Sequence, residues 1–391
     1  MKIVLFAHPD FLGQQSMPRF TNMLAESMRI KGYTVEIYSP QAYFFKLPVS
    51  GAMKKWLGYI DQFLIFPAVI KKRIRSNTNT VYVFTDQALG IWVPITKHFP
   101  TLVICHDFLA QRSAEGKIPQ NPTGTFGRIY QKLIRKGYSS ADNFISVSNK
   151  TQQDLHQFLG RVPKMSKVVY NGLNKSFNLI DSVSSRSILS KLTGLDLKDG
   201  YILHVGGNQW YKNRIGVVKI YTAWRLLSDK ILPLLLIGRI PSEALKQEIE
   251  TSPYKNDIFT LDNISDEYIN VVYSGASVLL FPSIAEGFGW PIAEAMASGC
   301  PVITTNEAPM TEVGGNAATY INIMPLTQQE ISIWADNAAN TLNKLINLPE
   351  ADMAEIIRNG ETNAKRFDTN IAMDEVERYI RETQTLMNVN I

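Results

Sequence analysis

The sequence predicts an α/β fold with two doubly wound domains, each a parallel sheet covered by helices on both faces. Short apolar runs recur along the chain, as in strands that are buried on both faces. Amphipathic segments with helical spacing separate these runs. The chain has 391 residues, of which 45% are apolar, and this suits two domains of roughly 150–200 residues better than one core. The expected strands are Ile3–Phe6, Thr34–Tyr38, Val81–Phe84, Leu102–Ile104, Phe144–Val147, Lys167–Tyr170, Tyr201–Val205, Pro233–Ile237, Ile258–Leu261, Val278–Phe281 and Val302–Thr304.

The same pattern predicts the helices and the domain boundary. Asn174–Asp199 interrupts the alternation, and its polar run 181–187 predicts an inter-domain linker. We therefore expect a first domain over residues 1–180 and a second over 196–367, with a C-terminal helix over 368–391 that packs back on the first domain. Because ligands bind beyond the carboxyl ends of the strands in such sheets, two facing domains would bind them in a cleft. The amphipathic segments between strands include Met17–Lys31, Thr151–Leu159, Arg214–Ser228, Asp266–Ser274 and Pro291–Ser298.

The cysteines and the apolar runs favour a cytoplasmic protein. Cys105 and Cys300 are the only cysteines and lack metal-ligand spacing, which indicates a reducing compartment. The N-terminal run Met1–Ala7 is too short for a signal peptide and is interpreted as the first strand. No apolar run reaches the length of about 18 residues that a transmembrane helix needs, so no such helix is expected.

Charge is distributed unevenly along the chain. Residues 1–180 carry 23 Lys and Arg against 9 Asp and Glu, and the remainder carries 17 against 26. The net charge of +5 therefore combines +14 in the first half with −9 in the second. A basic first half favours an anionic partner. Because no nucleic-acid-binding motif appears, we expect a negatively charged membrane surface or a lipid-phosphate acceptor rather than nucleic acid.

The segment Phe281–Gly299 predicts a ligand site where a strand passes into a helix. Its loop contains two glycines, which let the backbone come close to a ligand. Pro291 suits the first helical turn, so the free backbone N–H groups at the helix N-terminus would form an anion site. Glu286 and Glu294 would face the same crevice, where carboxylates suit the hydroxyl groups of a sugar or ribose.

This segment resembles the Glu-x7-Glu motif of retaining glycosyltransferases of the GT-B fold, glycosyltransferase family 4. Seven residues separate Glu286 from Glu294. The resemblance implies two facing Rossmann-like domains. It also implies that Glu286 contacts the donor sugar, that the loop amides meet the sugar and phosphates, and that Glu294 holds the ribose. Trp290 stands where the family often has an aliphatic residue, and its indole either packs in the core or contacts the nucleotide. The implied donor-binding residues of the loop are Gly287, Phe288, Gly289 and Trp290.

A second loop follows the strand Tyr201–Val205 and leads into a helix. It contains a Gly-Gly turn but matches neither a dinucleotide fingerprint nor a P-loop. Lys212, just ahead of the helix, can neutralise a diphosphate without a metal ion, and the loop resembles the family's glycine-turn and Lys-Asn motif. Gly207 and Tyr211 occupy the positions of the family's usual arginine, so Arg214 is the candidate replacement. The expected donor-binding residues of this loop are Gly207, Asn208 and Arg214.

Two polar residues, His106 and Asp107, end a buried strand in the first half. A histidine at a strand end suits a general acid or a sugar contact. The family resemblance places His106 over the donor sugar, and Asp107 is expected to orient the site on the acceptor side. The segment Phe11–Ser16 resembles the family's glycine loop, which faces the diphosphate and the acceptor. We accordingly expect Gly13 to bind the donor and Gln14 to lie on the acceptor side.

Basic and aromatic residues mix over residues 54–75, which is typical of proteins that bind the surface of an anionic bilayer. Peripheral contact with the inner face of the membrane is therefore expected. The same pattern also fits a helix packed on the core with a solvated basic end. The residues concerned are Lys54, Lys55, Trp56, Phe63, Phe66, Lys71, Lys72, Arg73 and Arg75.

The sequence therefore predicts a hexosyltransferase that uses a nucleotide-diphosphate sugar and a saccharide or lipid-linked saccharide acceptor, in cell-surface polysaccharide or glycolipid synthesis. Family habit favours GDP-mannose as donor, and the family implies retention of anomeric configuration. Glu286, His106 and Lys212 are the expected catalytic residues, because the charge of the leaving diphosphate must be met. No Asp-x-Asp motif occurs, so no metal and no cofactor is expected. The alternatives are another GT-B enzyme, such as a nucleotide-sugar epimerase or a phosphorylase, a non-catalytic nucleotide-sugar-binding subunit, or a basic nucleic-acid-binding protein.

Overall fold

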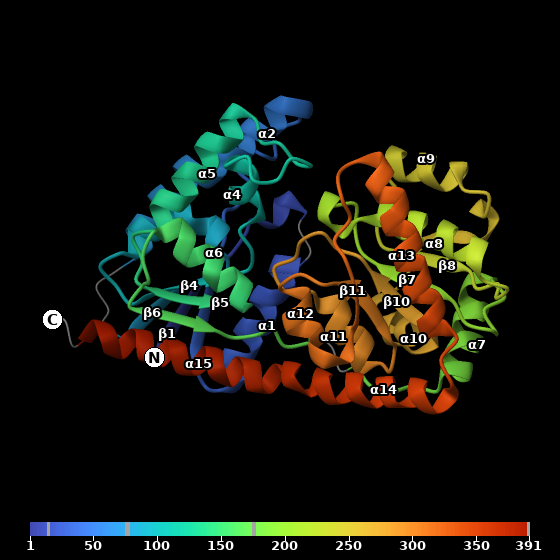
Figure 1. Cartoon of the computed structure of the whole chain (residues 1–391). Coiled ribbons are helices and arrows are strands. Elements are labelled where there is room, and N and C mark those ends of the chain that lie inside the picture. Colours follow the sequence, from blue (N-terminus) through green and yellow to red (C-terminus); the bar gives the residue numbers. More distant parts are fainter. Residues whose placement is uncertain (14–15, 75–78, 174–176, 389–391) are drawn as a thin grey trace. The chain divides into compact units, whose positions relative to one another are not determined.

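A computed structural model describes residues 1–13, 16–74, 79–173 and 177–388. The chain divides into two compact units. Unit 1 comprises Met1–Asn174 and Thr369–Ile391, and unit 2 comprises Lys175–Asp368. Each unit holds one six-stranded sheet with helices on both of its faces (Figure 1). The predicted α/β fold class with two doubly wound sheets is therefore confirmed.

The sheet of unit 1 has the strand order β2-β1-β3-β4-β5-β6, and all neighbouring strands are parallel. β3 and β4 are buried at every residue, which explains their nearly continuous apolar sequences. Phe6 of β1 stacks on Phe84 of β3 with 4.3 Å between ring centroids, so aromatic packing joins the central strands. The strands are β1 Lys2–Phe6, β2 Thr34–Tyr38, β3 Thr80–Phe84, β4 Thr101–Cys105, β5 Asn143–Ser146 and β6 Met165–Val168.

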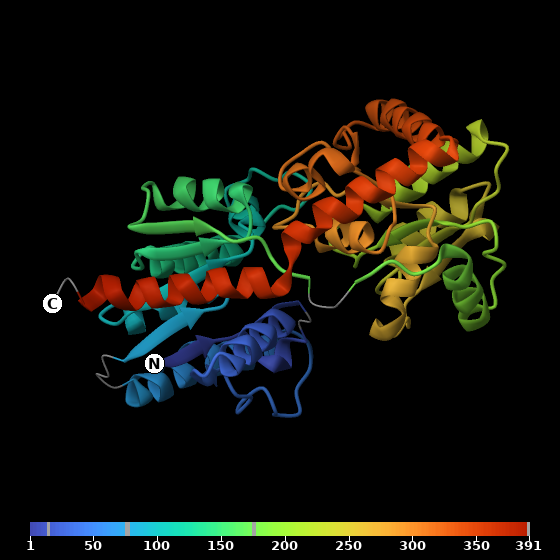
Figure 2. The same ribbon diagram turned by 90° about the horizontal axis from the view of Figure 1, so that it is seen from below.

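The helices of unit 1 come from both ends of the chain. The last helix, α15 (Thr369–Asn388), contacts α1, β3 and β4 (Figure 2). Its Met373 and Ile380 are buried, and its Glu377 accepts a hydrogen bond from the Tyr33 hydroxyl. Besides α15, the unit contains α1 Ser16–Ile30, α2 Gly51–Ile60, a π-helical turn Asp61–Ile65, α3 Phe66–Arg73, a 3₁₀ segment Gln87–Thr96, α4 Leu109–Ala114, α5 Thr125–Tyr138 and α6 Asn149–Leu159.

The sheet of unit 2 has the strand order β12-β11-β10-β7-β8-β9 and is also parallel throughout. All residues of β8, β10 and β11 are buried. The short edge strand β12 was not predicted from the sequence. The strands are β7 Ile202–Val205, β8 Leu234–Ile237, β9 Ile258–Leu261, β10 Val278–Phe281, β11 Val302–Thr305 and β12 Thr319–Ile321.

The helices of unit 2 include one in the segment that the sequence suggested as a linker. Helix α7 (Ser182–Thr193) packs on α10 within unit 2, so this part of the segment predicted as an inter-domain linker is helical. The Asp181 carboxylate caps α7 by accepting a hydrogen bond from Ser184 N at 2.8 Å. Few residues of α7 are buried, which is why its apolar periodicity was weak. The other helices are α8 Arg214–Leu227, α9 Glu243–Thr251, α10 Ile269–Gly275, α11 Trp290–Ala297, α12 Met310–Gly314, α13 Gln328–Ile346 and α14 Glu350–Ala364.

The strand orders locate the places where these sheets are suited to bind ligands. In unit 1 the chain builds outward from β1 to β2 and then crosses to β3 on the other side of β1. In unit 2 it builds from β7 through β9 and then crosses to β10 beside β7. Ligands of doubly wound sheets bind beyond the carboxyl ends of the strands at such switch points. The residues that follow β1 and β3, and those that follow β7 and β10, are therefore placed to contact a ligand.

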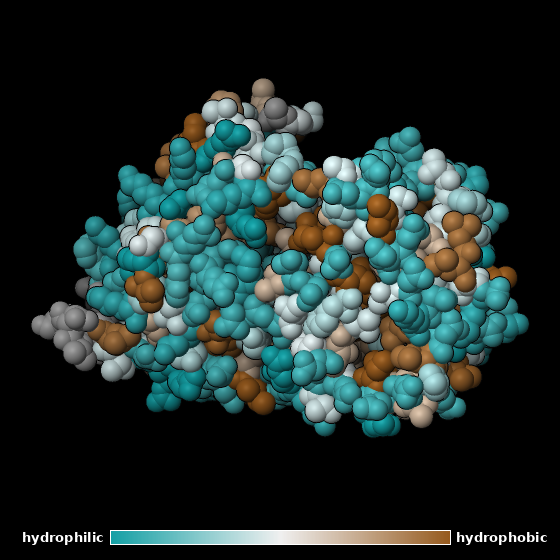
Figure 3. Space-filling model, viewed as in Figure 1, coloured by the Kyte–Doolittle hydropathy of each residue, from teal (hydrophilic) through white to brown (hydrophobic). Residues whose placement is uncertain are grey.

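The surface seen in Figure 3 is mainly hydrophilic, with apolar side chains in small separate groups. Among the helices of the described residues, none is both long and apolar enough to cross a membrane.

Candidate active site

Two loops of unit 2 meet at the switch point between β7 and β10. Ile284 N, after β10, donates a hydrogen bond to Tyr211 O, after β7, at 2.8 Å. The Asn213 side chain also bridges the loops, because its Nδ2 donates to Pro282 O at 3.0 Å and its Oδ1 accepts from Gly216 N at 3.2 Å. Asn213 thus caps α8 and fixes the loop after β10 at the same time.

Lys212 and Glu286, which the sequence singled out separately, form an ion pair in this place. Lys212 Nζ lies 2.7 Å from Glu286 Oε1, and their side chains are only 16% and 8% exposed. The Ser283 hydroxyl donates a second hydrogen bond to the same carboxylate oxygen at 2.9 Å. The ammonium also lies 5.2 Å from the centre of the Phe281 ring. The acidic group is therefore held rigidly next to a cation, at the carboxyl end of β10.

Glu294 lies in α11 and has a different partner. The Tyr273 hydroxyl of α10 donates a hydrogen bond to Glu294 Oε2 at 2.9 Å. Burial, together with the Glu294 charge, raises the pKa of Tyr273 well above its ordinary value, so Tyr273 remains a donor at neutral pH. The sequence did not predict this tyrosine, which lies in a helix rather than in a loop motif.

The loop before α11 contains a backbone conformation that favours glycine. Gly289 adopts φ +105°, in the left-handed region, directly before the helix begins at Trp290. Phe288 is buried and packs edge-on against Phe367 at 5.4 Å. Trp290 is partly buried and lies 6.4 Å from the Phe288 ring. In this loop the Phe288 side chain is thus a packing group, and only its backbone is available to a ligand.

Arg214 is a buried cation whose guanidinium group is only partly satisfied. The residue is 5% exposed, and its Nη1 donates to Asn208 Oδ1 at 2.6 Å and to Arg239 O at 2.9 Å. Its Nε and Nη2 atoms are buried and have no hydrogen-bond partner among the described residues. Burial lowers the pKa of Arg214. A buried donor left unsatisfied costs about 1–3 kcal/mol, and more when it is charged, so this group is poised to receive an anion.

His204, in the middle of β7, was not recognised from the sequence. Its Nδ1 donates to Leu280 O of β10 at 3.0 Å, which joins the two strands of the switch point. Burial lowers the pKa of His204 to about 3, and the nearby charges of Arg214 and Lys212 act in the same direction. A Cβ atom on Gly206 would lie 3.0 Å from His204 Nε2, so a larger residue in the turn after β7 would press on the His204 ring. Gly207 follows this turn.

In unit 1, His106 follows β4 and is 7% exposed. Its Nε2 lies 2.9 Å from Thr85 O, and since a carbonyl only accepts, Nε2 carries the proton. Burial lowers the pKa of His106, although the charge of Asp86 opposes this shift. A neutral ring with its proton on Nε2 presents only a hydrogen-bond acceptor at Nδ1. In this geometry Nδ1 can accept a hydrogen bond from a sugar hydroxyl, while the proton on Nε2 is held by Thr85 O.

The other predicted residues of unit 1 have local roles in the described structure. Asp107 accepts a hydrogen bond from Leu109 N at 2.9 Å, at the beginning of α4. Gly13 follows a 3₁₀ turn after β1 and adopts φ +64°, where glycine is favoured. Gln14 lies outside the described residues.

A histidine–aspartate pair at the switch point of unit 1 was missed from the sequence. His8 Nε2 lies 2.9 Å from Asp86 Oδ2, and both side chains are 10% exposed. Burial alone would raise the pKa of Asp86, but the hydrogen bond and charge of His8 outweigh it and lower the pKa. The two residues lie just beyond the ends of β1 and β3, and that shared placement is the signal that could have found them. Among the described residues, no group of three or more His, Cys, Asp or Glu side chains could hold a metal ion.

Comparison with known families accounts for most of the chain. Residues 17–177 match the family described as Glycosyltransferase Family 4. Residues 185–362 match the family described as Glycosyl transferases group 1.

Curated relatives match about half of the chain. The O-antigen chain mannosyltransferase RfbU of Salmonella typhimurium is 28% identical over 203 residues, which cover 51% of this chain and 53% of the relative. The O-antigen chain mannosyltransferase B of Escherichia coli is 33% identical over 193 residues, which cover 49% of this chain and 50% of the relative. The chain thus spans about half the length of these relatives.

Solved structures resemble the whole chain. Anabaena HepE, determined in complex with UDP-glucose, has a TM-score of 0.70 and 18% identity, and the match covers 98% of this chain and 99% of HepE. Sucrose-phosphate synthase of Thermosynechococcus elongatus has a TM-score of 0.72 and 17% identity, and the match covers 98% of this chain and 99% of the synthase. Likeness at these identities shows a shared fold.

Proposed function

The chain belongs to glycosyltransferase family 4, with a glycosyl transferases group 1 segment, and from this premise we propose that it transfers a hexosyl group from a nucleotide-diphosphate sugar to an acceptor hydroxyl. The observation that carries the proposal is the arrangement at the switch point of unit 2. Lys212 is paired there with Glu286, and the buried Arg214 keeps two nitrogen atoms without partners among the described residues. Two cations and one carboxylate suit a ligand that combines phosphates with hydroxyl groups.

In this proposal the diphosphate exchanges partners with the ion pair. Its oxygens accept hydrogen bonds from Lys212, from Arg214 and from backbone N–H groups at the start of α11. Glu286, released from the lysine, then accepts hydrogen bonds from the sugar hydroxyls, and Glu294 holds the ribose. The cations then stabilise the leaving nucleoside diphosphate as its charge develops.

We propose mannose as the transferred sugar, because both relatives described above are O-antigen mannosyltransferases, and GDP-mannose as its donor from the habit of the family. Their names also support a saccharide or lipid-linked saccharide acceptor in polysaccharide synthesis. We propose retention of configuration on the strength of the family, with the acceptor oxygen attacking on the face that the diphosphate leaves. No metal is required in this scheme, because Lys212 and Arg214 supply the positive charge.

The full-length chain is expected to bind GDP-mannose and to release GDP, with no loss of rate in EDTA. A ligand at 100 times its dissociation constant stabilises a protein by about 2.7 kcal/mol, so a thermal-shift series with GDP-, UDP-, ADP- and dTDP-sugars identifies the donor. Nucleotide release is then followed with that donor. Production of sugar phosphate instead of nucleoside diphosphate would identify a phosphorylase. Binding without turnover would identify a non-catalytic subunit, and rescue by magnesium after EDTA would contradict the metal-free scheme.

We also propose that unit 1 contacts an anionic membrane from the cytoplasmic side through a face formed by α2 and α5. Trp56 of α2 and Phe126 of α5 are 58% and 78% exposed, and their rings lie 6.5 Å apart. Lys55 and Lys132 are exposed on the same two helices, so apolar and basic side chains lie together. An anionic bilayer complements both the apolar area and the charge. Of the basic residues suggested from the sequence, Arg75 lies outside the described residues.

The double substitution Trp56→Gln and Phe126→Gln is expected to reduce binding to vesicles that contain phosphatidylglycerol about tenfold or more, because two aromatic side chains no longer enter the interface. Sedimentation of the full-length chain with vesicles measures this. Val162→Gln is the matched control, because Val162 is 72% exposed in unit 1 but lies outside α2 and α5. Equal binding to vesicles of phosphatidylcholine alone would contradict the role of charge.

A further inference from the structure

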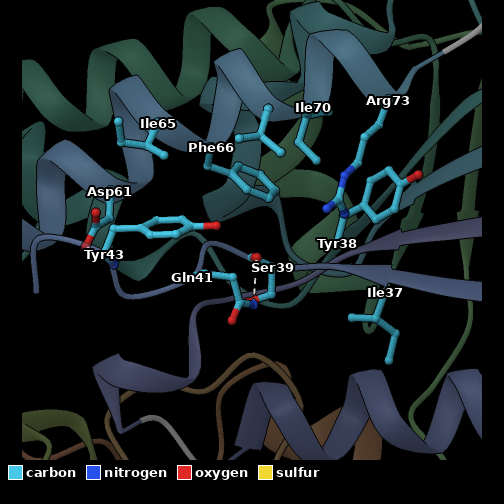
Figure 4. Close-up of a pocket in the computed structure, with 11 residues that line it drawn as sticks. Ile37, Tyr38, Ser39, Gln41, Tyr43, Asp61, Ile65, Phe66, Ile70 and Arg73 are labelled. Carbon is cyan, nitrogen blue, oxygen red and sulfur yellow. Dashed lines mark hydrogen bonds between the residues drawn. The ribbon is translucent and has the colours of Figure 1, made fainter. Parts of the chain in front are cut away.

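A cavity of about 190 Å³ lies in unit 1 beyond the carboxyl end of β2 (Figure 4). One wall is formed by Tyr38 and Ser39 at the end of β2, and the opposite wall by Phe66 and Arg73 of α3. Tyr43 closes one side, and its hydroxyl points toward the Phe66 ring. The cavity is smaller than the pockets of about 300–1,000 Å³ that hold drug-sized ligands, so it fits a group of about one ring.

The rim of the cavity is fixed by a buried carboxylate. Asp61 is 1% exposed and accepts hydrogen bonds from three successive backbone N–H groups, those of Tyr43 at 3.1 Å, Phe44 at 3.0 Å and Phe45 at 2.9 Å. These bonds hold the backbone of the 43–45 segment in one conformation and satisfy both oxygens of the Asp61 carboxylate. The wall is therefore preorganised, which lowers the entropic cost of binding.

Among the described residues that line the cavity, Arg73 is the one cation and Asp61 is the one carboxylate, and the Asp61 oxygens already accept the three backbone hydrogen bonds. The Arg73 guanidinium lies 5.7 Å from the centre of the Tyr38 ring and points into the cavity in Figure 4. No carboxylate of the described residues forms a salt bridge with Arg73. Glu36 is near enough to Arg73 for their charges to attract each other. Glu36 is, however, paired with Lys2, whose Nζ lies 2.7 Å from Glu36 Oε1, and it accepts a hydrogen bond from the Tyr38 hydroxyl at 3.0 Å. An anion in the cavity would therefore meet a guanidinium group that has no salt-bridge partner among the described residues.

The cavity adjoins the switch point of unit 1. The Ser39 hydroxyl, which lines it, donates a hydrogen bond to His8 O at 3.0 Å. His8 in turn is paired with Asp86, beyond the ends of β1 and β3. The cavity thus lies at the same edge of this sheet as His8, because β2 and β1 are neighbouring strands.

We infer that this cavity is a subsite for a sugar unit of the acceptor that carries an anionic group, either phosphate or carboxylate. The sugar ring packs against Tyr43 and Phe66, and the anionic group is bound by Arg73. Aromatic rings suit the apolar faces of a sugar, while the hydroxyl groups of Ser39 and Tyr43 exchange hydrogen bonds with its hydroxyls. The inference deepens the proposed function and rests on it, because the acceptor is named only for a transferase.

Calorimetry on the full-length chain tests the subsite with mannose 6-phosphate, glucuronic acid, methyl mannoside and inorganic phosphate as probes. We expect one of the two anionic sugars to bind at least about tenfold more tightly than methyl mannoside or inorganic phosphate. Preference for mannose 6-phosphate identifies phosphate as the bound group, and preference for glucuronic acid identifies carboxylate. Equal binding of inorganic phosphate, or no binding of either anionic sugar, overturns the inference.

Two substitutions assign the binding to this cavity. Arg73→Gln is expected to weaken the anionic sugar about tenfold to a hundredfold, whereas Lys72→Gln, which removes a neighbouring exposed charge on α3, leaves it unchanged. Equal losses in the two variants would show a general charge effect and overturn the inference. Val69 of α3 also lines the cavity. Val69→Phe fills the cavity without changing charge and should abolish binding, with an unchanged thermal unfolding curve as the check on folding. Retained binding in Val69→Phe would likewise overturn it.

The donor provides the separate test of the proposed function. Nucleotide-sugar binding and the slow release of nucleoside diphosphate to water should be the same in Arg73→Gln as in the unaltered chain. Failure of these donor reactions in the unaltered chain rejects the transferase proposal. Intact donor reactions without binding of either anionic sugar reject the subsite alone.

Discussion

Glu286→Gln is expected to lower the turnover number for glycosyl transfer about 10²- to 10³-fold while leaving the affinity for the nucleoside diphosphate unchanged or higher. The substitution preserves the size of the side chain but removes the negative charge that is held between Lys212 and Ser283. That charge would balance the positive charge that develops on the sugar in the transition state. Removal of one preorganised group that stabilises transition-state charge lowers the turnover number of other enzymes about 10²- to 10³-fold. Lys212 loses its partner and becomes fully available to the phosphates.

The measurement is the rate of nucleoside diphosphate release at saturating donor, together with nucleotide affinity from calorimetry. Glu243→Gln is the control, because Glu243 has an 88% exposed side chain on α9 and pairs only with Lys246 among the described residues. A Glu286→Gln variant with near-normal turnover would remove Glu286 from the site. A variant with reduced nucleotide affinity and normal turnover would show that Glu286 only positions Lys212.

Arg214→Met should separate stability from donor binding. In the unliganded protein the substitution removes a buried, partly unsatisfied cation as well as the hydrogen bonds to Asn208 and Arg239 O, so the free energy of unfolding should change by no more than about 1 kcal/mol. The methionine chain retains most of the packing. Loss of the charge-assisted bonds to a phosphate should weaken nucleotide binding about tenfold to a hundredfold.

Thermal unfolding with and without the nucleotide measures both effects. Arg225→Met is the matched control on the same helix. Arg225 is bonded to Asp257 and Tyr221, so its removal should lower the melting temperature and leave the shift caused by the nucleotide intact. If Arg214→Met were strongly destabilising yet showed a normal nucleotide shift, Arg214 would be a structural residue of the loop.

Most of the fold could be predicted because its strands are buried on both faces. β8, β10 and β11 have no exposed residue, so their sequences are nearly all apolar and bounded by turns. The prediction failed where burial is slight. Helix α7 buries only Ser185 and Leu189, and β12 is a three-residue edge strand with one buried residue.

The candidate site could be predicted one residue at a time but not as an arrangement. Glu286 and Lys212 were found from their local motifs, yet they are 74 positions apart, and nothing in either motif specifies the bond between them. His8 and Asp86 were missed because neither belongs to a motif, and only the neighbouring positions of β1 and β3 bring them together. The pairing of distant side chains depends on strand order, which the alternation of strands and helices leaves open.

Helix α15 has a consequence for how the protein is made. Helix α15 (Thr369–Asn388) covers part of the sheet of unit 1, yet it is synthesised after every residue of unit 2. During translation unit 2 can finish folding while the first sheet still exposes the apolar surface that Met373 and Ile380 will cover. The order of folding is therefore expected to be the reverse of the order of synthesis, and the nascent first unit is the stage at which a chaperone would be needed.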